Sequence, residues 1–277
     1  MKKKVVIGLG IVIIVIVILL VIFLGDKSLD LESEQIANLY SYLGEVDVYH
    51  CGGLNQYSGE EVTYDTLSND NKLCMAYYEL SEEKKAKNTA EVTITNDNDI
   101  SVCEIGEGTR LAANENEEEC YYNTINKEDL IEAYQKVYGK DLPDETSFYI
   151  SGTEACYLEG EEYNCGNAET YMVSLTPEAT IYRLMNKAVE KMNGDIVISD
   201  YYLRISDNKC YSSNSSNSEI SACSTIITDN PNEEITSEFV LEHGSIYEHT
   251  FKQDKDGNYY WYSSNLGSTL FSGVILK

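Results

Sequence analysis

The residues with the clearest chemical potential in this chain are eight cysteines and three histidines. Cys51 directly follows His50 in the stretch VDVYHCGGLNQY, so it is a candidate nucleophile, metal ligand or disulfide partner. A cysteine hydrolase needs a thiolate with a histidine base nearby. Neighbouring side chains of a strand point to opposite faces, so His50 is badly placed as that base, and His243 or His249 would have to approach through folding. A free thiol would also leave an odd cysteine among the other seven, which favours a disulfide.

The cysteines fall into neighbouring pairs along the chain. The segment from Cys156 to Cys165 is typical of a tight hairpin with Gly160 at its tip, and the segments that begin at Cys103 and Cys210 have the same character. Opposed strands bring cysteine side chains within bonding reach. Other connectivities stay open, because spacing does not prove a pairing. We therefore expect the structural disulfides Cys51–Cys74, Cys103–Cys120, Cys156–Cys165 and Cys210–Cys223.

Metal binding has little support in the sequence. Structural zinc sites use closely spaced cysteine knuckles, and none occurs here. The stretch DKDGN at 254–258 is similar to part of a calcium loop, but that frame places Lys252 first and Ser263 last, where acidic residues are required. A hairpin turn centred on Asp256 and Gly257 is the better interpretation.

Two fragments of the penicillin-binding type of serine enzyme also occur. Ser81–Lys84 matches S-x-x-K and Ser206–Asn208 matches S-D-N, but the third element, K-T-G, is absent, and residues 249–251 are a poor substitute. The first fragment is typical of a solvated helix face and the second of a hairpin turn.

The remaining titratable residues single out no site. His243 and His249 lie on either side of a glycine and match no helical metal-ligand spacing. The 47 acidic residues supply too many carboxylate pairs to identify a glycoside hydrolase site. We therefore predict no catalytic residue, no metal and no cofactor.

Charge and composition limit the partners. The net charge is −27, and acidic residues outnumber basic ones by 47 to 20, so nucleic acid is a poor partner. High net charge favours solubility at a crowded surface, and a cationic partner or calcium is the alternative reading. The 23 tyrosines suit half-buried antiparallel sheets, and they also suit surfaces that bind sugars or proteins.

The N-terminus predicts a membrane location. Three lysines precede Val5–Leu24, a stretch of 20 residues without charge, which as a helix is long enough to cross a bilayer. A cleaved signal peptide would be shorter and would end in small residues. We expect a cytoplasmic stub at 1–4, a single transmembrane helix at 5–24, and the remaining chain outside, where disulfides persist.

The rest of the chain alternates helical and strand patterns. Residues 33–45, 68–87, 126–143 and 176–195 have apolar positions at helical spacing, with caps at Ser68, Asn126 and Thr176. Strands are expected over residues 195–206, 219–228, 244–254 and 257–264.

These patterns predict an α+β fold. After the transmembrane helix we expect a disulfide-bonded ectodomain of antiparallel sheets with about four packed helices. The acidic stretch at 110–119 is a weak boundary between an N-terminal lobe, 25–110, and a C-terminal lobe, 120–277, although one domain is the alternative.

The stretch FKQDKDGNYYWYSSN at 251–265, together with the lysine-led N-terminus, is similar in style to surface proteins of low-GC Gram-positive bacteria. That similarity implies no activity. The main hypothesis is a non-catalytic recognition or cell-envelope module that contacts surface proteins or cell-wall glycans. The alternatives are an envelope-acting hydrolase whose site the sequence does not reveal, and an assembly subunit that pairs through its membrane helix.

Overall fold

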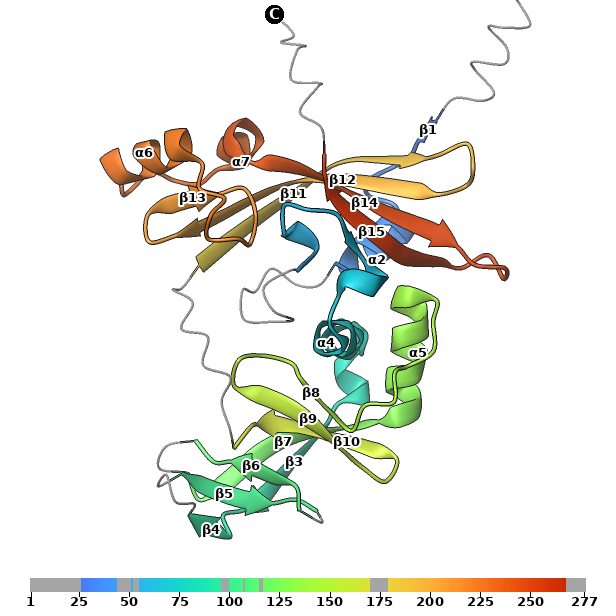
Figure 1. The fold of residues 1–277 in the computed structure, drawn as a ribbon, viewed down its shortest axis with the longest axis vertical. Coiled ribbons are helices and arrows are strands. Elements are labelled where there is room, and N and C mark those ends of the chain that lie inside the picture. The colour runs from blue at the N-terminus through green and yellow to red at the C-terminus, as the bar shows by residue number, and fades with distance from the viewer. Residues whose placement is uncertain are drawn as a thin grey trace, which may run out of the picture.

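The computed structural model describes residues 26–43, 51, 55–95, 100–106, 108–114, 117–169 and 179–267. The described chain forms three antiparallel sheets with five α-helices around them. Helices α4 and α5 lie between the largest sheet and the two smaller ones (Figure 1).

The largest sheet holds seven strands and comes mostly from the C-terminal part of the chain. Short strands from the N-terminal part flank it, so both ends of the described chain meet in one sheet. Its order is β1 (Lys27–Ser28), β11 (Ala179–Glu190), β12 (Ile196–Ser206), β14 (Ser245–Gln253), β15 (Tyr259–Leu266) and β2 (Val62–Thr63), with β13 (Lys209–Tyr211) paired to β12.

The middle of the chain forms the two smaller sheets. The five-stranded sheet has the order β3 (Ala86–Glu91), β7 (Glu119–Asn126), β10 (Glu162–Asn167), β9 (Glu154–Glu159) and β8 (Ser147–Tyr149). The three-stranded sheet has the order β4 (Ile94–Thr95), β5 (Ser101–Glu104) and β6 (Arg110–Ala112). Strands β3 and β7 pair although they come from either side of residues 110–119. The division into two lobes stays a prediction.

Three predicted helices are confirmed as α2 (Glu34–Ser41), α4 (Asn69–Glu79) and α5 (Lys127–Tyr138). Ser68 and Asn126 cap α4 and α5 as expected, because their side-chain oxygens accept backbone N–H groups of the first turn. Gly139 ends α5 in the left-handed conformation, with φ 61°. The other elements are α6 (Ser221–Asp229), α7 (Ser237–His243) and the 3₁₀ turns η1 (Asn55–Tyr57), η2 (Tyr64–Thr66) and η3 (Glu82–Lys84).

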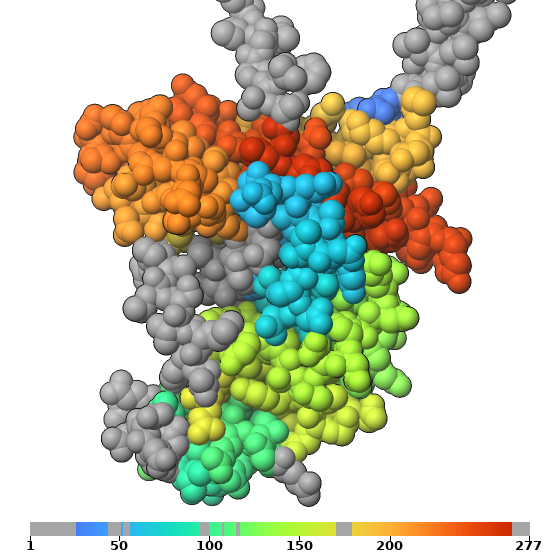
Figure 2. All heavy atoms as spheres, in the orientation of Figure 1, coloured from blue at the N-terminus to red at the C-terminus, as the bar shows by residue number. Residues whose placement is uncertain are grey.

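The main core fills the space between the large sheet and the five-stranded sheet. Apolar residues of α2, α4 and α5 meet Phe251 and Trp261 of the large sheet on one side and Phe148 and Tyr163 on the other. A separate apolar cluster lies where α6 and α7 meet β12. In Figure 2 the light-blue and cyan segment before α4 lies at the surface between the large sheet and the lower layers.

The predicted fold class needs correction. The described chain is mostly antiparallel sheet with five helices and four disulfides, not a membrane helix followed by a domain with about four helices. In that part of the chain, no helix has both the length and the apolar character needed to cross a bilayer. The span predicted at 5–24 lies outside the described residues.

The helix predicted over 176–195 is wrong, because residues 179–190 form strand β11. Met185 and Ala188 lie against the main core, whereas Leu184 packs against the cluster under α7. A register shift between Met185 and Lys187 moves the in–out alternation by one residue. A strand with apolar residues on both faces and a bulge in its middle imitates the spacing of a helix. Thr176, the expected cap, lies outside the described residues.

The strand predicted over 219–228 is also wrong, because residues 221–229 form helix α6. Its β-branched residues favour a strand. Tertiary contacts decide otherwise, since Cys223 is bonded to Cys210 and Ile227 packs into the adjacent apolar cluster.

Candidate functional site

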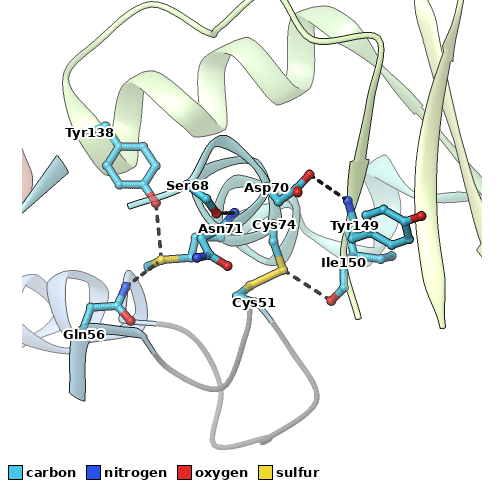
Figure 3. The surroundings of a disulfide bond; sticks show 10 residues. Cys51, Gln56, Ser68, Asp70, Asn71, Cys74, Tyr138, Tyr149 and Ile150 are labelled. Atoms are coloured by element: carbon cyan, nitrogen blue, oxygen red, sulfur yellow. Dashed lines mark hydrogen bonds between the residues drawn. A yellow bond between two sulfur atoms is a disulfide. The ribbon is translucent and has the colours of Figure 1, made fainter. Parts of the chain in front are cut away.

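Cys51 is bonded to Cys74 and is therefore not a free nucleophile in this structure. Cys74 projects from α4, and its Sγ lies 3.4 Å from the carbonyl oxygen of Ile150 (Figure 3). Asp70, one turn earlier, accepts the N–H of Tyr149 at 3.2 Å. Both contacts fix α4 against the end of β8 and the residue that follows it. His50 lies outside the described residues.

All eight cysteines form disulfides, and disulfide bonding is confirmed. The partners are the sequence neighbours favoured by spacing. Cys156 and Cys165 lie directly opposite one another on β9 and β10. Among the described residues, no group of three or more His, Cys, Asp or Glu side chains is arranged to hold a metal ion. The structural bonds are Cys51–Cys74, Cys103–Cys120, Cys156–Cys165 and Cys210–Cys223.

His249 belongs to a buried polar network in the large sheet. Its Nε2 lies 3.1 Å from Asp200 Oδ1, and its Nδ1 lies 2.6 Å from Ser264 Oγ. The indole of Trp261 donates to the same Ser264 oxygen at 3.0 Å. Because the ionised Asp200 carboxylate only accepts, Nε2 carries the N–H that donates to it, and in that neutral tautomer Nδ1 accepts from the Ser264 hydroxyl. The order Ser–His–Asp resembles a catalytic triad.

Asp200 is the residue of this network with the most hydrogen-bond partners. Its Oδ2 accepts hydrogen bonds from the hydroxyls of Tyr40, at 2.5 Å, and Tyr57, and it lies 3.4 Å from Nε of Arg183. Burial alone would raise the pKa of Asp200, but the imidazole of His249 and the guanidinium of Arg183 hold that pKa below its usual range. The carboxylate therefore stays ionised inside the sheet.

Burial decides what this network can do. The side chains of Asp200, His249 and Ser264 all have 0% exposure, so a substrate has no path to Ser264 in this structure. The contacts instead join η1, α2 and four strands of the sheet. We interpret the network as structural, because a nucleophile must be open to the bond it attacks.

The residues of the S-x-x-K and S-D-N fragments and His243 lie in or next to turns and at a helix end. Lys84 of the S-x-x-K fragment lies in the exposed η3 turn and forms an ion pair of 2.6 Å with Asp129. Asp207 and Asn208 form the tight turn between β12 and β13, with φ 50° and 57°. His243 lies at the end of α7 against Phe239, away from His249. Within the part of the chain that the structure describes, none of these side chains contacts another group that would complete the predicted chemistry.

The candidate site with the richest mixture of aromatic and polar side chains is a groove of about 580 Å³ between α2, α5 and the β14–β15 hairpin. This size is typical of small-ligand sites. In Figure 2 the hairpin tip (red) projects at the right of the molecule, just above α5 (green). The lining contains three tyrosines and several planar polar side chains, namely Gln35, Asn38, Leu39, Tyr42, Gln135, Lys136, Gly139, Asp254, Asp256, Asn258, Tyr259 and Tyr260.

The hairpin turn that forms one wall of the groove is held by hydrogen bonds within the turn. Asp254 Oδ1 accepts the backbone N–H of Asp256 at 2.8 Å and that of Asn258 at 2.9 Å. These backbone hydrogen bonds, that of Asn258 first, hold the pKa of Asp254 below its usual value. Gly257 has φ 92°, as a tight turn requires. The turn predicted at Asp256–Gly257 is confirmed.

The opposite wall contains a lysine whose positive charge is balanced by an ion pair. Lys136 forms an ion pair with Glu79 of α4, and its ammonium lies 5.4 Å from the centre of the Tyr42 ring. Burial, together with the nearby Glu79 carboxylate, raises the pKa of Tyr42 to about 12. Tyr42 therefore keeps its hydroxyl proton at neutral pH. On the far side, Tyr260 packs against Gly139.

Sequence reasoning did not find this groove, because its walls come from residues 35–42, 135–139 and 254–260. The one available signal was the high tyrosine content, which suggested sheet or sugar contacts without naming a location. The chain matches no protein-family model, and neither a curated protein nor a solved structure matches it.

Proposed function

We propose that this chain is a non-catalytic recognition module of an extracytoplasmic compartment, and that the groove between α2, α5 and the β14–β15 hairpin binds neutral glycans. The observation that carries the proposal is the combination of tyrosine rings with amide side chains in one concave site. Aromatic faces pack against the apolar faces of sugar rings, and Asn and Gln both donate to and accept from hydroxyls. The four disulfides support an oxidising location.

The charges of the groove favour a neutral ligand. Lys136 is already paired with Glu79, so its charge is balanced within the protein. The remaining charged groups of the lining, Asp254 and Asp256, are both acidic. An anionic polymer would be repelled by these carboxylates and by the net charge of −27.

The alternative of a glycoside hydrolase has less support at this groove. Such an enzyme needs a carboxylic acid that holds its proton at working pH, and this requires a raised pKa. The pKa of Asp254 is lowered instead by its backbone hydrogen bonds. Asp254 is therefore suited to accept hydrogen bonds and not to protonate a leaving group.

The test is affinity electrophoresis of the full-length chain in gels that contain a neutral polysaccharide, compared with gels that contain a uronic acid polymer. We expect retardation only by a neutral polysaccharide. Replacing exposed Gln35 or the ring of Tyr260, as Gln35→Ala and Tyr260→Ala, should weaken binding by about tenfold each, which corresponds to about 1.4 kcal/mol.

The matched control is Tyr262→Ala. Tyr262 lies on the same strand and is 42% exposed, but it is outside the lining of the groove. Its loss should leave retardation unchanged. Equal weakening in Tyr260→Ala and Tyr262→Ala, or retardation by the uronic acid polymer alone, would contradict the proposal.

A further inference from the structure

Lys72 is a buried cation with few partners. The residue is 7% exposed, and it lies in the second turn of α4. Its ammonium donates one long hydrogen bond, 3.5 Å, to Asn69 Oδ1. Its other close neighbour is the ring of Tyr64, 4.1 Å from the nitrogen to the ring centre. An ammonium carries three donors, so these contacts leave capacity for an acceptor.

The other buried charges of the described chain are satisfied differently. Lys85 is 8% exposed, and its ammonium lies 3.2 Å from the Glu82 carboxylate. Asp200 has Arg183 at 3.4 Å. Burying a charge costs much free energy unless an opposite charge compensates it. Within the described residues, Lys72 has no carboxylate within 4.0 Å, although acidic residues outnumber basic ones by 47 to 20.

A second ammonium lies at the same ring. Lys140 is exposed and follows the end of α5, and its nitrogen is 4.6 Å from the centre of the Tyr64 ring. Tyr64 is fixed by a hydrogen bond of 2.8 Å between its hydroxyl and that of Tyr134, and by a ring contact with Tyr138. Two cations thus lie at one aromatic ring, whose face attracts both of them, and an anion beside them would offset their mutual repulsion.

We propose that Lys72, Lys140 and Tyr64 form a binding site for a phosphate group, either free phosphate or the monoester of a larger ligand. The two ammonium groups match the double negative charge of such a group at neutral pH, and lysine binds phosphate as a point charge. The partly exposed ring and the exposed Lys140 give the site its access to solvent. This inference is independent of glycan binding in the groove.

The test is equilibrium dialysis of the full-length chain with labelled inorganic phosphate at constant ionic strength, so that screening does not vary. We expect saturable binding of one phosphate per chain. Lys140→Ala should weaken it roughly tenfold, and Lys72→Met, which keeps an apolar stem, should weaken it at least as much. Lys87→Ala removes one exposed lysine from β3 and is the matched control, for which no change is expected.

Competition separates the sources of the phosphate group. Displacement by glycerol phosphate at a lower concentration than by free phosphate indicates a monoester ligand, and the reverse indicates free phosphate; acetate, with one charge, should compete weakly in either case. The proposal is overturned if phosphate does not saturate, or if Lys140→Ala and Lys87→Ala lower binding equally. Because Lys140 is exposed, its variant remains informative even where Lys72→Met unfolds.

Discussion

At the scale of single residues, Asp200 is the most consequential side chain of the large sheet. Replacing it by Asn keeps its size but removes the carboxylate that lies 3.4 Å from Nε of Arg183, whose side chain is 4% exposed. Removing one member of a buried ion pair costs about 3–5 kcal/mol. We expect Asp200→Asn to lower the free energy of unfolding by that amount in urea denaturation at neutral pH, and Asp141→Asn, at an exposed position, to change it by about 0.5 kcal/mol or less.

The contribution of Asp200 to stability should decrease at acid pH. The pKa of Asp200 is lower in the folded chain than in the unfolded one, where it is about 3.9. Its stabilisation is therefore present above that unfolded value and is lost as the pH falls through the folded value. The wild-type chain should lose stability more steeply than Asp200→Asn below about pH 4. Parallel acid profiles of the two proteins would contradict the role given to Asp200.

What could be predicted at this scale depended on distance along the chain. The cysteine partners are between 9 and 23 residues apart, so neighbour spacing was informative. The network around Asp200 was missed because Tyr40 and Asp200 are 160 residues apart and His249 and Asp200 are 49 apart. Only the pairing of strands brings those residues together.

At the scale of elements, helices with local signals were predictable and strands with two buried faces were not. Helix α5 has a cap at Asn126, an apolar stripe and a terminating Gly139, all readable within 14 residues. Strand β11 is specified by its pairing with β12 and by the bulge after Met185. Helix α6 is likewise held by Cys210 and the cluster under α7, against the preference of its own residues.

Gly139 links an element boundary to the candidate site. Its φ of 61° is unfavourable for other residues, and a Cβ there would lie 2.9 Å from Cγ and Cδ1 of Tyr260. Gly139→Ala should therefore cost about 1–2 kcal/mol of backbone strain and a further 1–3 kcal/mol, roughly, because the ring must move. It should also weaken glycan binding, since Tyr260 lines the groove.

Gly194→Ala is the control that separates the backbone strain of Gly139→Ala from its clash with the Tyr260 ring. Gly194 also has positive φ, 87°, but nothing lies within 4 Å of an added Cβ. It should show the backbone strain alone and keep glycan binding intact. Equal losses of stability in the two variants, measured by urea denaturation, would show that the contact between Gly139 and Tyr260 does not position the ring.

At the scale of the whole molecule, tyrosine supplies most of the large aromatic side chains that fill the core. The largest fully buried side chains of the described chain include six tyrosines and one tryptophan. These tyrosines come from several elements, from Tyr57 of η1 and Tyr202 of the large sheet, through Tyr134 and Tyr138 of α5, to Tyr163 of the five-stranded sheet. A core of this kind contains many ionisable hydroxyls. The free energy of unfolding must therefore change when the pH is raised into the alkaline range.

The buried tyrosines set the direction of that dependence. Burial raises the pKa of Tyr57 and of Tyr138 well above 10.0, and it raises that of Tyr42 to about 12. In the unfolded chain tyrosines titrate near about 10, so between these values the folded state holds protons that the unfolded state has lost. Stability is therefore complete below about pH 10 and falls as the pH rises toward and beyond the folded values. The tyrosinate absorbance of the buried tyrosines should rise together with the loss of circular dichroism in one cooperative alkaline transition, whereas the same chain in urea should titrate smoothly at about pH 10. Smooth ionisation of all 23 tyrosines before any loss of circular dichroism would contradict a tyrosine-based core.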